Sequence, residues 1–376
     1  MQPKAARNIP IEALRLVAVA GIAVFHTFQW TFQATCVGLP EYAPLAAFPY
    51  SGVLGFINLL GCWANEVFFM ISGYFLIASA ARAWDGGTTW KSQMQRTSQR
   101  LGKVVMPTAL YCLVALAWST VVSPIPDVTL NTHYWYTLGL EFIWVYAATV
   151  FMAPWFGLAK CRLSQKSYTT TVIAVGILAF VVNGYLAAMS ATSAGEFSWL
   201  QKLMSAATYV IAFLIGGLLR DVTDAVDSDR AGALGMRSLA AVLALATILE
   251  GALSFTGNLT AMAALSYKST SLISFALAAA SLLFAATRRS ASGNPRTAGV
   301  IVTLSTATLG FYVMQSLTSS LWRPVFNTLL ANMLVSQNSP AAICIITGTV
   351  ISIVFALALL IIDAARSLIV RKLKRQ

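Results

Sequence analysis

The chain has 376 residues, of which 58% are hydrophobic and only 10% are charged, and its mean hydropathy is +0.73. Soluble domains carry about 25% charged residues, so this composition excludes a soluble enzyme, a secreted disulfide scaffold and a disordered chain. The net charge of +12 would suggest nucleic acid as the partner of a soluble protein, but in a membrane protein it reflects loop orientation. We therefore expect no nucleic-acid partner, and the five scattered cysteines predict neither disulfides nor a metal site.

Long apolar stretches recur along the whole chain. About 20 such residues cross the roughly 30 Å hydrocarbon core of a bilayer as a helix, whereas strands of membrane barrels are shorter and alternate in hydrophobicity. We therefore expect an all-α, polytopic membrane helix bundle that forms a single domain over residues 1–376. Its predicted helices, ten in number, lie near 11–33, 53–79, 104–122, 134–157, 168–189, 203–219, 238–256, 267–287, 298–321 and 341–362.

The positive residues predict the orientation of these helices, because cytoplasmic loops are enriched in Lys and Arg. With the N-terminus inside, 22 of the 25 Lys and Arg residues lie in cytoplasmic segments or at the inner end of the first span. Only Lys202, Lys268 and Arg323 remain for the outer side. Both termini are therefore expected in the cytoplasm.

Arg15 and His26 lie 11 residues apart in the first predicted span. This spacing places them on one helix face, about 16 Å apart along the axis. Because ionisable groups inside a bilayer are costly, the pair suggests a tunnel that receives an anionic ligand at Arg15 and transfers a proton at His26. The alternative is that Arg15 reaches the inner interface and that His26 only hydrogen-bonds a neighbouring helix.

Carboxylates occur in three further predicted spans. Glu66, which precedes Ser72 and Tyr74, either orients His26 or binds a substrate hydroxyl, or it is a protonated group that bonds an adjacent helix. Glu141 either lines the same cavity or makes a bond between helices. Glu250 has the least support for a functional role.

Arg96, Arg100 and Lys103 gather positive charge in a predicted loop just before a helix that starts near Pro107. Their helical spacing of four and three residues could hold phosphate groups. The alternative is that they are ordinary cytoplasmic positive residues facing lipid head groups.

Several motifs together resemble the signature of the acyltransferase 3 family of integral membrane acyltransferases. The first span contains an arginine, ten residues and then a histidine in IEALRLVAVAGIAVFHTF. The later matches, in chain order, are NEVFFMISGYFLI, RTSQRLGKVVMP, HYWYTLGLEFIWVYAATVFMAPW and YVIAFLIGGLLR. One departure is Gln315 in LGFYVMQSL, where the family usually has a histidine; the expected proton-transfer role then falls more exclusively on His26.

The resemblance implies transfer of an acyl group, usually acetyl from acetyl-CoA, to a hydroxyl of a cell-surface or exported saccharide. It implies Arg15 and His26 as the essential catalytic pair, with Glu66 in support. His26 would act as a general base, or it would carry the acyl group in a covalent intermediate. The phosphates of acetyl-CoA would favour Arg15, Arg96, Arg100 and Lys103 at the inner face. The saccharide acceptor, possibly lipid-linked or polymeric, would contact residues of the helix-2 and helix-4 motifs, namely Ser72, Tyr74, Trp135 and Glu141.

The family also implies a multi-pass protein of a bacterial inner membrane, here expected in the standalone form without a fused hydrolase-like domain. The aromatic residues Trp30, Trp135 and Tyr136 could stack on sugar rings or belong to an interfacial belt. The alternative function is a transporter or flippase of a polar or lipid-linked glycan, which would also need ionisable residues in a central cavity. The two halves of the chain show no clear internal repeat of the kind that many transporters have.

Overall fold

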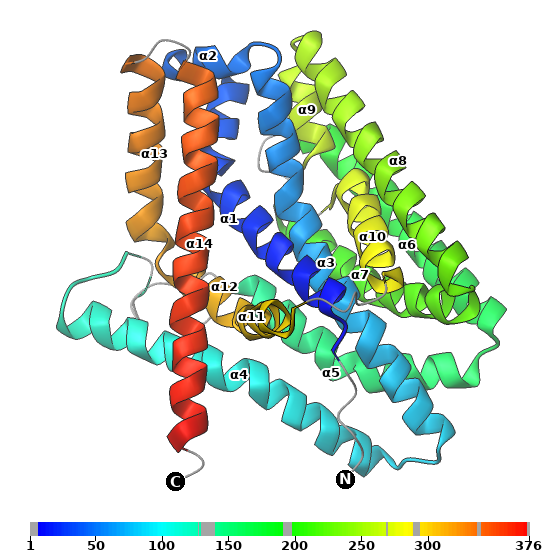
Figure 1. The fold of residues 1–376 in the computed structure, drawn as a ribbon. Coiled ribbons are helices and arrows are strands. Elements are labelled where there is room, and N and C mark those ends of the chain that lie inside the picture. Colours follow the sequence, from blue (N-terminus) through cyan, green and yellow to red (C-terminus); the bar gives the residue numbers. More distant parts are fainter. Residues whose placement is uncertain are drawn as a thin grey trace.

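The structure is a computed structural model that describes residues 7–126, 128, 140–190, 198–267, 270–288, 294–336 and 340–373. All regular elements in these ranges are helices, so the expected all-α class is confirmed. They are shown in Figure 1 and comprise α1 (Ile9–Val37), η1 (Pro40–Tyr42), α2 (Ala43–Ala46), α3 (Tyr50–Asp85), α4 (Trp90–Val121), α5 (Glu141–Arg162), α6 (Gln165–Ser190), α7 (Ser198–Ala225), α8 (Ser228–Phe255), α9 (Leu259–Leu265), α10 (Leu272–Thr287), α11 (Pro295–Ser305), α12 (Thr308–Leu317), α13 (Ser319–Ser336) and α14 (Pro340–Leu373).

Eight of these helices are long and apolar enough to cross a membrane, which makes the protein a multi-pass membrane protein. A ninth span is formed if α11 and α12, which meet at a bend of 41°, are counted as one. The prediction of ten full spans was too high, because the stretch at 267–287 forms only the 16-residue helix α10. The stretch predicted at 298–321 is not one helix either, since it is divided among α11, α12 and the start of α13.

Hydroxyl side chains bond backbone carbonyls at the break between α11 and α12. Ser305 donates to the carbonyl of Val302 at 3.1 Å, and Thr306 donates to that of Thr303 at 2.7 Å. Ser305 also donates to a Glu12 carboxylate oxygen at 2.6 Å, which fixes the broken point against the start of α1. A polar anchor on another element thus holds the bend, and no local pattern of hydrophobicity reveals it.

The second correction concerns α4, which begins at Trp90 and not near residue 104. Arg96, Arg100 and Lys103 therefore lie on a helix rather than in a loop, and Pro107 lies inside that helix. The structure shows α4 running obliquely along the lower edge of the bundle (Figure 1). It contacts α5 and α12 and exposes much of its apolar second half.

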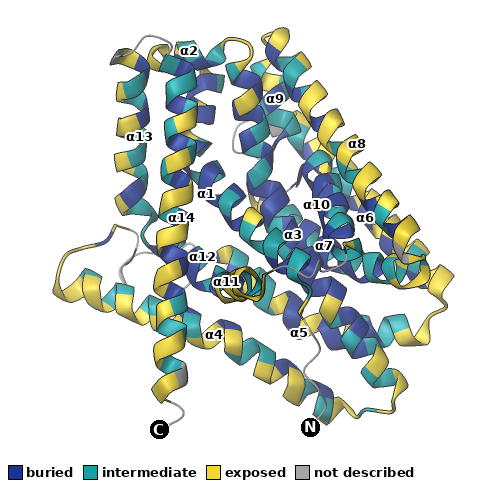
Figure 2. Ribbon diagram, in the orientation of Figure 1, coloured by how far each residue is buried: buried dark blue, intermediate teal, exposed yellow. Residues whose placement is uncertain are grey.

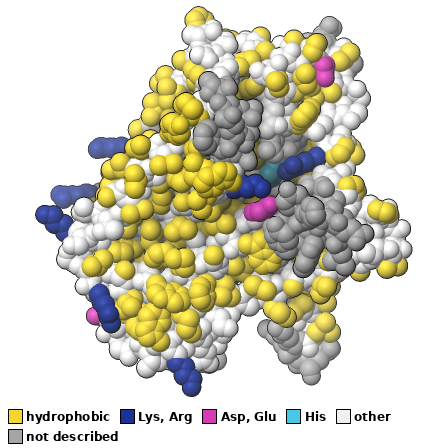
Figure 3. All heavy atoms as spheres, turned by 180° about the vertical axis from the view of Figure 1, so that it is seen from behind, with side chains coloured by type: hydrophobic (Ala, Val, Ile, Leu, Met, Phe, Trp, Pro, Cys, Tyr) yellow, Lys and Arg dark blue, Asp and Glu magenta, His cyan; other side chains and the backbone are white. Residues whose placement is uncertain are grey.

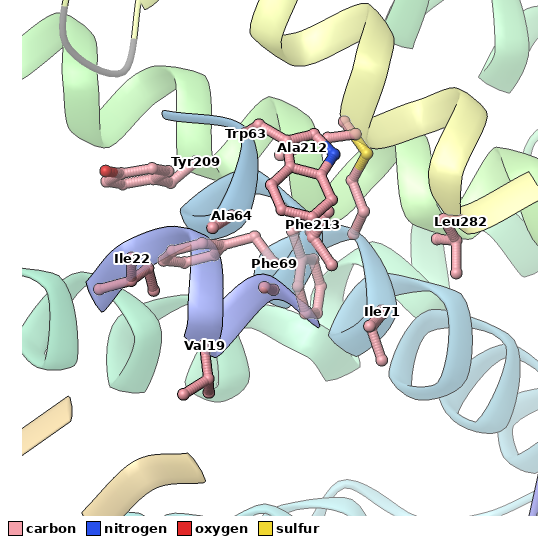
Figure 4. Close-up of a cluster of buried hydrophobic side chains, with 14 of the residues drawn as sticks. Val19, Ile22, Trp63, Ala64, Phe69, Ile71, Tyr209, Ala212, Phe213 and Leu282 are labelled. Carbon is pink, nitrogen blue, oxygen red and sulfur yellow. The ribbon is translucent and has the colours of Figure 1, made fainter. Parts of the chain in front are cut away.

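Helix α3 forms the centre of the bundle. Of the spanning helices it is the most buried, with 72% of its most apolar stretch inside the protein, as its dark colour in Figure 2 shows. It packs against α1, α5, α7, α8 and α10. Figure 4 shows the resulting core, in which Trp63, Phe69 and Ile71 of α3 meet Ile22 of α1 and Phe213 of α7.

Glycines allow α3 and α7 to approach until their backbones touch. A methyl group added at Gly73 would clash with the carbonyl oxygen of Phe213, and one added at Gly216 would clash with that of Met70. Small residues have this role in membrane bundles because lipid supplies no hydrophobic force between helices, so association depends on close packing. The α3–α7 crossing is therefore set by these two positions.

In Figure 1, α1 starts in the lower half of the bundle, above α4, and α14 ends at its lower edge. The expectation that both termini are on one side of the membrane stays a prediction. The assignment of that side to the cytoplasm remains a prediction from the distribution of Lys and Arg. We expect green fluorescent protein fused after Gln376 to fluoresce in cells and alkaline phosphatase at the same position to be inactive; the opposite result would reverse the topology.

Substitution at the α3–α7 crossing should destabilise the fold. For Gly216→Ala we expect a loss of about 1–3 kcal/mol in the free energy of unfolding, because the added methyl group must displace backbone. The measurement is unfolding in mixed detergent micelles. Gly251→Ala on α8 is the matched control, since nothing lies within 4 Å of the added carbon and alanine favours a helix; equal effects of both substitutions would refute the packing argument.

Candidate active site

Helix α1 carries both Arg15 and His26, and its packing on α3 sets the direction of the histidine. The helix is continuous from Ile9 to Val37 and is capped by Asn8, whose side chain accepts from the Ile11 amide at 3.2 Å. The Phe25 ring occupies the space above Gly61 of α3 that any larger side chain would fill. Because successive residues of a helix are rotated by about 100°, the seating of Phe25 against α3 turns His26 toward a different neighbour.

That neighbour is Arg323 on α13. Its guanidinium nitrogen Nη2 lies 3.0 Å from His26 Nδ1, and the Gln29 side chain, one turn further along α1, also interacts with the ring. An arginine has hydrogen-bond donors only, so Nδ1 must accept in this contact. A neutral imidazole that accepts at Nδ1 carries its proton on Nε2.

A sharp change of direction after α12 brings Arg323 to this place. The α12 helix ends at Leu317 and α13 begins at Ser319. The indole nitrogen of Trp322 donates to the carbonyl of Gln315 at 3.0 Å, which ties the start of α13 back to α12. The sequence placed Arg323 among the few outer-side cations, but nothing in the sequence pairs it with His26.

A polar cavity of about 460 Å³ lies between α1, α3, α5, α7 and α12, and α1 contributes Phe25 and Gln29 to its lining rather than His26 itself. Figure 3 shows a histidine side chain on this face of the molecule, with basic side chains beside it and an acidic one below. The polar lining residues are Gln29, Asn65, Glu141, Gln201, Lys202, Ser205, Tyr209 and Tyr312.

A second cavity, of about 130 Å³ and mostly apolar, lies next to the first. The two share Phe142 and Tyr312, whose ring centroids are 4.5 Å apart, so this pair of rings forms the partition between them. The apolar cavity is also lined by Ile22, one turn before His26, and by Val104, one turn after Arg100. It therefore occupies the space between the basic part of α4 and the polar cavity.

Arg15 lies half-buried near the start of α1 and has an acidic partner. Its Nη1 is 2.9 Å from Glu12 Oε2, the oxygen that also accepts from Ser305. Glu12 lies in the first turn of α1, one turn before Arg15, and the sequence pattern does not connect it with Ser305. The guanidinium retains further donors beyond this ion pair.

The cluster on α4 forms one basic face, as its spacing predicts, but its members differ in exposure. Arg96 and Lys103 are exposed, whereas Arg100 is half-buried and donates to Ser79 of α3 at 3.4 Å. The exposed side chains of Arg96 and Lys103 and the hydrogen-bonded side chain of Arg100 are therefore available to bind anionic groups.

Glu66 is fully buried in α3. Neither of its carboxylate oxygens has a hydrogen-bond partner within the described part of the chain, and no contact with His26 is observed. Glu250 of α8 is likewise buried without a partner for its oxygens in those residues and lies against Gly55. The proposed orientation of His26 by Glu66 therefore has no direct hydrogen bond to support it.

The remaining residues expected at an acceptor site are separated by the structure. Ser72 bonds the Tyr146 hydroxyl at 2.9 Å beside the apolar cavity, and Tyr74 bonds Thr223 at 2.9 Å on α7. Both side chains are buried and already satisfied by protein groups. Glu141 does line the polar cavity, whereas Trp135 lies outside the described residues.

Comparisons with known proteins identify the family. A family model described as an acyltransferase domain matches residues 8–359. Comparisons with curated proteins and with solved structures gave no match. The match includes α1 to α13 and most of α14, and with them His26, Arg323 and both cavities. The chain therefore belongs to the acyltransferase 3 family of integral membrane acyltransferases.

Proposed function

We propose that the protein transfers an acyl group, acetyl from acetyl-CoA, to a hydroxyl of a cell-surface or exported saccharide. The observation that carries this proposal is a polar cavity that Phe25 and Gln29, the neighbours of His26 on α1, help to line and that shares the rings of Phe142 and Tyr312 with an apolar cavity. The polar cavity, at about 460 Å³, has the size of an ordinary small-molecule site. A bacterial inner membrane is the proposed location.

The donor would bind from the basic side. Arg15, Arg100 and the exposed Arg96 and Lys103 offer charge-assisted hydrogen bonds to the phosphates of coenzyme A. The apolar cavity that begins near Val104 would take the uncharged arm of the donor, and the thioester would reach the partition at Phe142 and Tyr312. Along this route the charged phosphates lie at the basic residues, the uncharged arm lies in the apolar cavity, and the thioester meets the acceptor at the polar cavity.

The acceptor would occupy the polar cavity. Its lining is rich in amide and hydroxyl groups, such as those of Asn65, Gln201 and Ser205, which suit the hydroxyls of a sugar. Glu141 and Lys202 add one charge of each sign to the same wall. Trp135 stays a predicted acceptor contact.

The chemistry assigned to His26 is general-base catalysis. As the acceptor oxygen attacks the thioester carbon, the imidazole takes the hydroxyl proton, and the carbonyl oxygen becomes an oxyanion. Collapse of this intermediate breaks the carbon–sulfur bond, and the imidazolium returns the proton to the departing thiolate. The products are the ester and free coenzyme A.

Removal of the imidazole should abolish most activity. For His26→Gln we expect acyl transfer to fall about 10²- to 10⁴-fold, the usual contribution of a general base, with donor affinity unchanged. The measurement is release of free thiol from acetyl-CoA by the purified protein in nanodiscs. A transporter with the same cavity would bind a glycan but release no thiol, so absence of thiol release by the folded wild type, with donor and saccharide acceptors present, would contradict the proposal.

Replacement of the Arg15 guanidinium should weaken donor binding. For Arg15→Lys we expect the affinity for acetyl-CoA to fall about tenfold, or about 1.4 kcal/mol, because an ammonium cannot replace a bidentate contact to phosphate. Isothermal titration with coenzyme A measures this directly. Arg237→Lys, at an exposed position of α8, is the matched control, and unchanged binding by Arg15→Lys would remove Arg15 from the donor site.

A further inference from the structure

Arg323 has no counter-ion among the described residues. Within the described ranges no carboxylate oxygen lies within 4.0 Å of it, although the half-buried arginines Arg15, Arg220 and Arg366 each have one. Arg100 also has no carboxylate there, but it donates to Ser79. Its Nε is buried and has no hydrogen-bond partner among the described residues, and its Nη2 lies against the ring nitrogen Nδ1 of His26; both atoms belong to Arg323. Burial of an unpaired charge costs several kcal/mol, so such an arrangement is expected where a negative charge forms during function.

The contact with His26 also has a direct chemical consequence. While Arg323 donates to Nδ1, that nitrogen cannot accept a proton, and Nε2 already carries one. In the observed state His26 is therefore unable to act as a base through either nitrogen. For the reaction to proceed, the guanidinium must leave Nδ1.

We propose that Arg323 is a second catalytic residue, which holds the lone pair of His26 Nδ1 in the absence of substrate and moves onto the thioester oxygen during transfer. This inference rests on the proposed function. The same displacement frees the base and delivers the cation, because both groups start within 3.0 Å of each other. Nδ1 of His26 is therefore free to accept a proton only when the carbonyl oxygen of the donor is present to take up Arg323.

Acyl transfer along this route conserves protons and electrons. The acceptor oxygen forms a bond to the thioester carbon and gives its proton to Nδ1, which has lost the bond to Arg323. The electron pair of the carbonyl moves to its oxygen, and the guanidinium donates to that oxyanion through the free donors, including Nε. When the carbon–sulfur bond breaks, the carbonyl reforms, the proton passes from Nδ1 to sulfur, and Arg323 returns to the ring.

The surroundings of Arg323 support this role and distinguish it from Lys202. Tyr312 interacts electrostatically with Arg323. Its ring is one of the two that line both cavities. The Trp322 ring lies 5.6 Å from the guanidinium carbon and is itself held by its hydrogen bond to Gln315, so the aromatic face beside the guanidinium has a fixed position. Lys202 lines the polar cavity but makes no observed contact with His26.

The first test is the tautomer of His26, observed by ¹⁵N NMR of histidine-labelled protein in nanodiscs. The chain has only two histidines, and a His26→Gln spectrum assigns the signals. We expect wild-type His26 to show an unprotonated Nδ1 and a protonated Nε2, and Arg323→Met to change this pattern, whereas the control Arg237→Met does not. A ketone analogue of acetyl-CoA, with a methylene in place of sulfur, should change the Nδ1 signal of the wild type.

The second test separates catalysis from binding. For Arg323→Met we expect kcat for acyl transfer to fall about 10²- to 10³-fold, as for loss of one oxyanion donor, with KM for acetyl-CoA unchanged. Arg323→Lys should recover part of the loss because it restores the charge. A protonated Nδ1 in the wild type, an unchanged Nδ1 signal on adding the analogue, or an unchanged kcat in Arg323→Met would each overturn the proposal.

The two tests also distinguish this inference from the proposed function. The tautomer of His26 in the protein without donor is observable whether or not acetyl-CoA is the substrate. If wild type shows the expected tautomer and Arg323→Met alters it, but no thiol is released by the wild type, the acyl donor assignment fails and the oxyanion role of Arg323 fails with it. If thiol is released and Nδ1 is protonated, the acyltransferase assignment stands and the role of Arg323 is wrong.

Discussion

Direct backbone contact between α3 and its neighbours is the constraint on which the rest of this bundle depends. At Gly73 and Gly216 the α3 and α7 backbones touch, and at Gly61 the Phe25 ring of α1 lies against the α3 backbone. Because lipid does not drive helices together, such fits have to supply the association energy through close packing. They also fix the rotation of α1 about its axis, and so the direction in which His26 points.

Polar and charged groups inside the bundle fall into two kinds. Some form closed sets, as where Tyr111 and Arg366 donate to Asp363 at 2.6 and 2.7 Å and join α4 to α14. Glu12, which joins α1 to α11 through Ser305, is another. These sets satisfy their members and connect elements that are distant in sequence, which is the role of a structural anchor in a low-dielectric medium.

Other buried groups lack such partners. Glu66 and Glu250 have no hydrogen-bond partner for their carboxylates within the described residues, and Arg323 has no carboxylate beside it there. An ionisable group without a partner is costly inside a membrane. Of these three residues, Arg323 is the one that contacts His26, the only described histidine. Breaks in the helices make that contact possible. Two short helices, α11 and α12, turn the chain so that α13 returns to α1.

The amino-acid sequence by itself determined the class of protein, most of the spanning helices, and the alignment of Arg15 and His26 on one face. These features depend on composition and on the 3.6-residue period of a helix, and both are local properties. The motifs around His26 and Glu66 likewise indicated the acyltransferase 3 family, which the family comparison confirmed over residues 8–359.

Only the tertiary structure decided which polar groups meet. The contact of Arg323 with His26 spans 297 positions and that of Ser305 with Glu12 spans 293, and both depend on bends at hydroxyl-rich positions that hydrophobicity does not register. The same holds for Ser72 and Tyr74, whose place in a motif suggested substrate contact although Tyr146 and Thr223 bond them. A helix period shows which side chains share a face, but the packing of neighbouring helices determines what that face touches.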